Sequence, residues 1–360
     1  MSQIHIEKLV KNFGDFVAVA ESDLTINDGE FFVLLGPSGC GKTTTLRMIA
    51  GLEIPTSGKI LLDKEDVTFL RASQRDIAFV FQLFALYPHM NVRKNLAFPL
   101  KMQKFSKHEI ESRINEVAKL LRIEHIINSK VSGLAGGDRQ RVALGRAIVR
   151  RPKAFLMDEP LGTLDAEFRE LMCLELRKLH NNINATTVYV THDQLEAMSM
   201  GDRIAVMNEG KIIQSGPPKE IYSKPKSKFV GSFIGSPAMN FIPINEGIKS
   251  GQQNVKIGNI EFAIPKQYQD TNSKNNHLGI RPEKMYLSDD QGIEGEVYGS
   301  EYLGSRKILT IQSFFGNFKI RVSNDLNANL GSNVKVNFES KSAIIFDGDT
   351  ENALKSESIN

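Results

Sequence analysis

The chain has 360 residues, of which 24% are charged and 41% hydrophobic, and its formal net charge is +3. This composition is ordinary for a globular protein, the length suits about two domains with sizeable cores, and the charge is too small to argue for nucleic acid as a partner. The two cysteines, Cys40 and Cys173, are spaced for neither a metal site nor a disulfide framework, which suits a reducing compartment. The N-terminus has no apolar run of signal-peptide length, and no run approaches the ~20 residues that span a bilayer. We therefore expect no secretion, and any membrane role to be peripheral.

The N-terminal stretch, residues 3–35, is predicted to form short strands and turns. It contains Phe13, an aromatic residue that precedes a glycine-rich loop. A ring in this place either stacks on an adenine or packs in the core of a hairpin, and the spacing leaves both alternatives open.

Residues 36–43 read Gly-Pro-Ser-Gly-Cys-Gly-Lys-Thr and fit the pattern G-x-x-x-x-G-K-[ST] at every fixed position. The apolar run 31–35 before them predicts a buried strand, and residues 44–50 after them predict a helix. In this context backbone N–H groups and a helix N-terminus bind phosphate. Lys42 is then expected to reach the β- and γ-phosphates and the Thr43 hydroxyl to bind Mg²⁺. A glycine-rich turn that matches by chance is the alternative.

A second buried strand is predicted over residues 77–81, and it ends at Gln82. A polar side chain at that end of a central strand either touches Mg²⁺ or positions a water, unless it is an ordinary loop residue. Residues 83–130 then predict a small helical insertion, because Ser106 and Glu109 fit a capping box ahead of apolar residues at helical spacing.

Residues 134–141, Leu-Ala-Gly-Gly-Asp-Arg-Gln-Arg, open a further predicted helix that ends near Pro152. Two glycines at its start form either a second anion site or a flexible helix entry.

The third predicted strand, 154–157, is followed by two acids, Asp158 and Glu159. The first can hold Mg²⁺ through water, and the second can accept a proton from an attacking water. Adjacent carboxylates are costly in a core without a cation, so the alternative is a surface loop. A fourth strand, 188–191, ends at His192, which can donate to a γ-phosphate, although a lone histidine is more often structural.

Residues 203–207 and 211–213 predict a hairpin, and after residue 237 the pattern changes to short alternating strands. Phe318, Ile320 and Val322 alternate with basic residues, and glycine turns separate such runs, as in small β-barrels. The last residues, from about Asp349, are polar and are predicted to fray.

These motifs, in this order, resemble the ATPase subunits of ATP-binding-cassette (ABC) transporters over nearly the whole chain. Residues 229–241 and 278–283 further resemble the importers of maltose, trehalose, glycerol 3-phosphate and related solutes. The resemblance implies an α/β P-loop NTPase (RecA-like) core with a helical insertion, followed by an all-β OB-like regulatory barrel. The implied domains are a nucleotide-binding domain at 1–235 with a helical subdomain at about 89–150, a TOBE-like barrel at 236–350, and a polar tail at 351–360.

The implied activity is hydrolysis of ATP with Mg²⁺ to power import of a solute, which would be a sugar, polyol or related carbohydrate. Glu159 would be the general base, His192 would contact the γ-phosphate, and Gln82 would contact Mg²⁺ and the lytic water. The implied metal site consists of Thr43, Gln82 and Asp158. The nucleotide-binding residues implied in the chain's own site are Phe13, Gly36, Pro37, Ser38, Gly39, Cys40, Gly41, Lys42, Thr43 and Thr44.

The resemblance also implies partners. Two ATPase subunits would face each other head to tail, with each ATP between the phosphate loop of one and the signature of the other, and Asp165 would couple the two sites. Residues around Leu83 to Met90 would form part of the groove that receives a cytoplasmic helix of the permease. The full set is a second ATPase subunit, two transmembrane permease subunits and, indirectly, a solute-binding protein, without nucleic acid, at the cytoplasmic face of the plasma (inner) membrane. The signature residues that would act in trans are Ala135, Gly136, Gly137 and Asp138.

The signature departs from the family pattern, Leu-Ser-Gly-Gly-Gln, at Ala135 and Asp138. Ala135 cannot donate the hydrogen bond that the family's serine gives to the γ-phosphate, which is worth roughly 1.5–3 kcal/mol. Asp138 adds a negative charge, although the first turn of a helix favours one. Because the chain's own motifs are intact while its trans motif is altered, we expect an asymmetric heterodimer with a paralogue in preference to a homodimer.

Two other functions compete with this one. A weakly hydrolysing regulatory subunit of a transporter is opposed by the intact Asp158, Glu159 and His192. A non-transport cassette ATPase that acts on DNA or ribosomes is opposed by the predicted barrel and by the presence of one cassette without long coiled coils.

Overall fold

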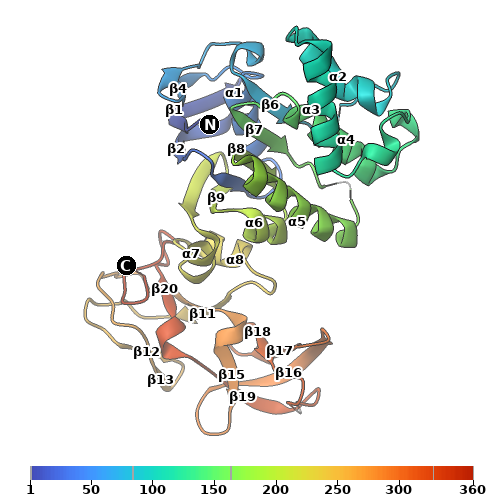
Figure 1. Ribbon diagram of the computed structural model, residues 1–360. Coiled ribbons are helices and arrows are strands. Elements are labelled where there is room, and N and C mark those ends of the chain that lie inside the picture. Colours follow the sequence, from blue (N-terminus) through green and yellow to red (C-terminus); the bar gives the residue numbers. More distant parts are fainter. Residues whose placement is uncertain (1, 83–84, 163, 327, 360) are drawn as a thin grey trace. The chain divides into compact units, whose positions relative to one another are not determined.

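The computed structural model describes residues 2–82, 85–162, 164–326 and 328–359. The chain divides into two compact units, Met1–Pro218 and Lys219–Asn360 (Figure 1). In these described ranges no helix has both the length and the hydropathy that a transmembrane helix needs.

A six-stranded sheet forms the centre of the first unit, in the order β10-β9-β3-β8-β7-β6. Every neighbouring pair is parallel except β9 and β10, which form the predicted hairpin. Its central strands are buried throughout, as their continuous apolar runs predicted. The strands are β3 (Phe31–Leu35), β6 (Ile77–Val80), β7 (Ala154–Asp158), β8 (Thr186–Thr191), β9 (Arg203–Asn208) and β10 (Lys211–Gly216).

Helices connect these parallel strands. Helix α1 (Lys42–Ala50) follows β3 directly, α5 (Ala166–Ile183) joins β7 to β8, and α6 (Gln194–Met200) joins β8 to β9. Three helices gather beside the sheet as the predicted helical insertion (Figure 1): α2 (Val92–Met102), α3 (Lys107–Leu120) and α4 (Gly136–Ile148). The predicted capping box of α3 is confirmed, since the side chains of Ser106 and Glu109 each bond the other's backbone N–H.

An antiparallel sheet completes the first unit, in the order β2-β1-β4-β5. Its strands are β1 (Ile4–Phe13), β2 (Phe16–Ile26), β4 (Ser57–Leu62) and β5 (Glu65–Asp66). Ile4, Ile6 and Ile60 from this sheet share one hydrophobic core with Leu46 of α1 and Leu34 of β3. The phosphate-loop segment between β3 and α1 is therefore anchored at both ends in a packed core.

The second unit is built from antiparallel strands, which confirms the predicted all-β C-terminal region. Two short helices, α7 (Pro218–Ser223) and α8 (Lys228–Phe233), precede the strands. A five-stranded sheet, β15-β19-β16-β17-β18, buries the predicted alternating residues Phe318 and Ile320. The strands are β11 (Asn240–Ile244), β12 (Asn254–Ile257), β13 (Ile260–Ala263), β14 (Asn276–Ile280), β15 (Met285–Ser288), β16 (Ile293–Tyr302), β17 (Lys307–Ser313), β18 (Gly316–Val322), β19 (Asn333–Phe338) and β20 (Ile344–Phe346).

The prediction that the chain frays from about Asp349 is wrong. Leu354 is buried in the core of the second unit, and its N–H donates to the carbonyl of Ile345 at 2.8 Å. The N–H of Ala353 donates to the carbonyl of Lys226 at 2.9 Å. Leu354, with Ala353 and Ile359 packed against a neighbouring cluster, and regular backbone hydrogen bonds hold this segment, and its mostly polar composition concealed both.

Candidate active site

The glycine-rich loop between β3 and α1 passes against neighbouring backbone at two of its glycines. A Cβ at Gly36 would lie 2.3 Å from the carbonyl oxygen of Met207, and one at Gly41 would lie 2.4 Å from that of Ala18. Gly41 also has a φ of 101°, in the left-handed region. Only glycine fits at these two positions, so the fold itself requires part of the motif.

Lys42 is buried beneath this loop. Its Nζ donates to the carbonyl oxygens of Gly36 and Pro37, each at 2.9 Å. The lysine thus lies against the loop through which the chain would bind phosphate. Gly41, the N-cap of α1, has no side chain to cap the first turn, so the N–H groups there suit an anion.

Thr43 and Asp158 meet at the end of β7, as the predicted metal site requires. The Thr43 hydroxyl donates to Oδ1 of Asp158 at 2.8 Å. Burial raises the pKa of the Asp158 carboxyl above its ordinary value, and the bond from Thr43 opposes that shift. A hydroxyl and a buried carboxylate are hard oxygen donors that suit Mg²⁺, which binds few protein ligands beside phosphates and water.

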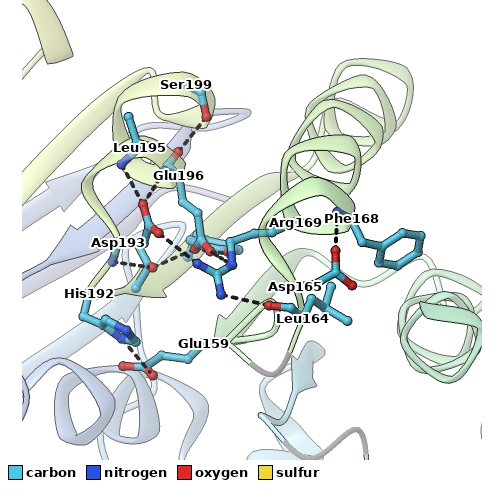
Figure 2. A network of polar contacts seen from close by, with 12 residues as sticks. Glu159, Leu164, Asp165, Phe168, Arg169, His192, Asp193, Leu195, Glu196 and Ser199 are labelled. Carbon is cyan, nitrogen blue, oxygen red and sulfur yellow. Dashed lines mark hydrogen bonds and ion pairs between the residues drawn. The ribbon is translucent and has the colours of Figure 1, made fainter. Parts of the chain in front are cut away.

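Glu159 and His192 form a pair beside this site (Figure 2). Their strands, β7 and β8, are parallel neighbours, so both residues lie at the same edge of the sheet. His192 Nδ1 lies 3.2 Å from Oε2 of Glu159. The N–H of Glu159 donates to the carbonyl of Val190 at 3.0 Å, although its φ of 44° lies in the left-handed region. Such a conformation in a residue other than glycine is a strain that concentrates at functional sites.

Two predicted site residues make no polar contact with this cluster in the described ranges. Gln82 is exposed just beyond β6, the neighbour of β7 in the sheet. Phe13 lies at the turn of the hairpin between β1 and β2, where it is 49% exposed and Lys11 Nζ lies 4.8 Å from its ring centroid. The alternative of a core aromatic is therefore wrong for Phe13, because about half of this residue is exposed.

The four signature residues open α4. Ala135 is the exposed N-cap and makes no side-chain cap bond. Gly137 is buried, and a Cβ there would lie 2.2 Å from the ring of Phe168. Asp138 lies in the first turn, 3.9 Å from a guanidinium nitrogen of Arg141. In the part of the chain that the structure describes, no hydrogen bond or ion pair joins these residues to the phosphate loop.

A polar network behind His192 was missed by sequence reasoning (Figure 2). Arg169 on α5 contacts the carbonyl of Leu164 and the side chains of Asp193 and Glu196. Asp165 caps the start of α5, accepting from the N–H of Phe168 at 2.9 Å. Nothing in the spacing of Arg169 pointed to its carboxylate partners, which lie 24 and more residues further along the chain.

Family models match two parts of the chain. The ABC transporter model matches residues 19–162, and the TOBE domain model matches residues 278–346. The first contains the phosphate loop, the signature, Asp158 and Glu159, and the second contains most of the five-stranded sheet.

Curated relatives are similar over nearly their full length. The trehalose/maltose import ATP-binding protein MalK of Thermococcus litoralis is 45% identical, over 98% of this chain and 100% of that protein. The sn-glycerol-3-phosphate import ATP-binding protein UgpC of a Ruegeria species is 46% identical, over 86% of each chain.

A solved structure shares the fold of the first unit. It is a post-hydrolysis state of an ATP-binding cassette, dimeric and bound to ADP and Pi, with 32% identity and a TM-score of 0.54 over 60% of this chain and 98% of that one. The chain therefore belongs to the family of ABC transporter ATP-binding subunits, and it is an ATPase with a TOBE domain at its C-terminal side.

Proposed function

We propose that this ATPase hydrolyses Mg-ATP to drive import of a sugar, polyol or related carbohydrate through a membrane permease. The observation that carries the catalytic part is the pairing of Glu159 with His192 at 3.2 Å, at the same sheet edge as the Thr43–Asp158 contact. The solute class rests on the relatives, which import trehalose, maltose and glycerol 3-phosphate.

The chain's own residues have separate tasks in this mechanism. Lys42 and the backbone of the phosphate loop hold the β- and γ-phosphates, and the exposed ring of Phe13 stacks on the adenine. Glu159 accepts a proton from the attacking water, and the contact with His192 holds the carboxylate in place. His192 donates to the γ-phosphate. The loop residues assigned to the nucleotide are Gly36, Pro37, Ser38, Gly39, Cys40, Gly41, Lys42, Thr43 and Thr44.

Thr43, Asp158 and Gln82 would hold Mg²⁺. Thr43 and Asp158 already lie within hydrogen-bond distance of each other. A cation there would offset the free-energy cost of burying the ionised Asp158 carboxylate. When bound there, Mg²⁺ would supply positive charge against the β- and γ-phosphates. Gln82 would have to turn toward Thr43 and Asp158 from its exposed place beyond β6.

We further propose that the chain pairs with a paralogue. Ala135, Gly136, Gly137 and Asp138 would close on the partner's ATP, and Ala135 has no hydroxyl to offer. The site formed by this chain's own phosphate loop would then close against an intact signature of the partner, so the two sites of the dimer would differ.

The remaining assignments concern the surroundings of the ATPase. It would lie at the cytoplasmic face of the plasma membrane, bound to two permease subunits and served by a solute-binding protein. Residues 83–90 would contact the permease, and Leu83 and the residue after it lie outside the described ranges. The boundary between the nucleotide-binding domain and the barrel, at 235/236, stays a prediction. Arg281, which follows this boundary in the sequence, donates to the carbonyls of Tyr222 and Gly231, which precede it.

The test is a Glu159→Gln substitution in a tagged chain purified from its host with its native partners. We expect ATP binding to persist and the ATPase rate to fall by about a hundredfold or more, because a positioned general base contributes about 10²–10⁴ in rate. Uptake of labelled trehalose, maltose and glycerol 3-phosphate in cells that carry the variant then tests the solute class. A rate that the substitution leaves unchanged contradicts the proposed hydrolysis.

A regulatory subunit with weak hydrolysis is the second candidate. In a homodimer Ala135 would face the ATP at both sites, so the missing hydroxyl would weaken hydrolysis at each of them. This candidate predicts that neither wild type nor Glu159→Gln hydrolyses ATP at this chain's own site, while transport by the complex still responds to ATP binding here.

A further inference from the structure

We propose that Arg169 is a positioning residue that ties the loop carrying Asp165 to the loop carrying His192, so that the two loops move as one. The inference rests on the proposed function, in which His192 contacts the γ-phosphate, and on the coupling of the two ATP sites that the family resemblance implies for Asp165. It adds the side chain that links these two roles within one subunit.

The first half of the link lies at the start of α5. Asp165 is the N-cap of this helix and accepts from the N–H of Phe168 at 2.9 Å. Nη2 of Arg169, one turn further along, donates to the carbonyl of Leu164 at 2.9 Å. The guanidinium therefore binds the backbone immediately before Asp165 and fixes how that residue enters the helix.

The second half lies at the start of α6. Nη1 of Arg169 donates to Oδ2 of Asp193 at 3.2 Å. The other carboxylate oxygen of Asp193 caps α6, accepting from the N–H groups of Leu195 at 2.7 Å and Glu196 at 3.2 Å. Asp193 directly follows His192, so its position sets the direction in which the histidine leaves β8.

An ion pair supports these two hydrogen bonds. Nε of Arg169 lies 3.6 Å from Oε1 of Glu196, too far for a hydrogen bond, and the carboxylate of Glu196 is almost fully buried. The other oxygen of Glu196 accepts from the hydroxyls of Tyr189 at 2.8 Å and Thr191 at 2.7 Å, both on β8. Figure 2 shows the planar group of Arg169 enclosed between these partners. A rigid fork with donors on three sides can hold two loops at once, which a single ammonium cannot.

The chain supplies a matched control in Arg177, on the same helix. Arg177 donates to the carbonyl of Met200 at 3.0 Å and to Asp202 at 2.7 Å, so it also joins one carbonyl to one carboxylate. Its side chain is 32% exposed and that of Arg169 is 30% exposed. Arg177 binds the C-terminal end of α6, away from His192. It therefore makes the same kinds of contact as Arg169 but does not contact the residues next to His192.

The test compares Arg169→Met with Arg177→Met in the complex purified through the tagged chain. Each ATPase rate is taken as the measured rate minus the rate that remains when Glu159→Gln is added to the same chain. We expect Arg169→Met to lower kcat by about ten- to a hundredfold, as small misplacements of catalytic groups do, with less than about a threefold change in the affinity for ATP. Arg177→Met should change kcat by less than about twofold and lower Tm by at least as much as Arg169→Met.

Two further variants separate positioning from general loss of structure. Asp193→Asn keeps the cap of α6, because asparagine caps as well as aspartate, and weakens the link to Arg169. Asp193→Asn should lower kcat, as Arg169→Met does, while its Tm stays near that of wild type. Arg169→Lys should fail to restore kcat even where it restores Tm, since it cannot reach Leu164 and Asp193 together.

A double-mutant cycle gives the sharpest outcome. If Arg169 acts through His192, the effect of Arg169→Met on kcat becomes small in a His192→Ala background, whereas that of Arg177→Met does not change. Additive effects, or equal losses of kcat in Arg169→Met and Arg177→Met, overturn the inference alone. A wild-type rate that Glu159→Gln leaves intact contradicts the proposed function, and the inference with it.

Discussion

The two halves of the proposed ATP site differ in how much of their structure the chain supplies by itself. On the phosphate-loop side, Lys42, Thr43, Asp158, Glu159 and His192 all have polar partners within the chain at 2.8–3.2 Å. On the signature side, among the residues that the structure describes, Ala135 makes no side-chain cap bond and Asp138 lies 3.9 Å from its partner Arg141. The phosphate-loop half is therefore held in place by contacts within the chain. The signature half is a helix N-terminus whose function depends on the nucleotide bound by a second subunit.

The largest effect should come from the most constrained glycine of the organised half. In Gly41→Ala the new Cβ meets the carbonyl of Ala18 at 2.4 Å, and φ is 101°. The left-handed conformation costs about 1–2 kcal/mol and overpacking about 1–3 kcal/mol. We expect the affinity for ATP, measured by titration calorimetry, to fall by at least about thirtyfold.

Gly39→Ala is its matched control, because φ there is also positive, at 80°, but no described residue lies within 4 Å of a Cβ. It should cost only the conformational part, about five- to thirtyfold in affinity. Equal losses at both glycines would mean that the packing against Ala18 does not organise the loop.

The next effect concerns the open half, where Ala135→Ser restores a hydroxyl. A serine at the N-cap stabilises a helix by about 1 kcal/mol, and a hydrogen bond to a charged phosphate adds about 1.5–3 kcal/mol. In a Glu159→Gln background we expect ATP-dependent self-association to strengthen by about ten- to a hundredfold in sedimentation velocity.

Ala135→Asp separates the two contributions, since aspartate caps equally well but has no hydrogen to donate to a phosphate. It should raise Tm as Ala135→Ser does, without the gain in association. If both variants gain equally, the effect of serine lies in α4 and not in a contact with phosphate.

A smaller effect distinguishes the two signature glycines. A Cβ at Gly137 would lie 2.2 Å from the Phe168 ring, whereas one at Gly136 meets only Leu164, at 3.8 Å. We expect Gly137→Ala to lower the free energy of unfolding by about 1–3 kcal/mol in urea titrations and Gly136→Ala to leave it nearly unchanged. A loss of ATPase activity in Gly136→Ala without loss of stability would show that this glycine serves the nucleotide and not the fold.

The smallest predicted effect concerns the buried carboxyl behind His192. Burial raises the pKa of Glu196, so its folded form resists ionisation. Below the ordinary pKa, about 4.3, the group is protonated in both states, and the stability it then contributes is lost as pH rises through the raised folded pKa. The Tm of Glu196→Gln minus that of wild type should therefore increase over that pH window in scanning calorimetry.

Glu109 provides a control of opposite sign. A bond from Ser106 lowers its pKa, so wild type gains stability as pH rises from the lowered folded pKa to the ordinary value. The Tm of Glu109→Gln minus that of wild type should therefore decrease as pH rises over this window. Parallel trends in the two variants would contradict the assignment of burial as the cause at Glu196.

Sequence reasoning found what local patterns encode. The buried runs of β3, β7 and β8, the phosphate loop and the capping box at Ser106 each depend on residues close together in the chain. The order of the motifs then indicated the family, and with it the antiparallel C-terminal region.

What the sequence could not give depends on contacts between distant residues. Thr43 and Asp158 are 115 positions apart, and the partners of Arg169 lie on another helix. The ordered C-terminal segment was missed because a few apolar residues, chiefly the buried Leu354, anchor a stretch that is mostly polar. Phe13 remained ambiguous because spacing does not reveal exposure.

The central claim is that this chain binds ATP fully in its own half-site but closes poorly on a copy of itself. Size-exclusion chromatography of the purified Glu159→Gln chain alone, with and without Mg-ATP, tests it most directly. We predict a chain that binds ATP and remains monomeric, because Ala135 and Asp138 weaken closure in trans. A stable ATP-dependent homodimer would contradict this claim and show that the glycine N–H groups of the signature suffice.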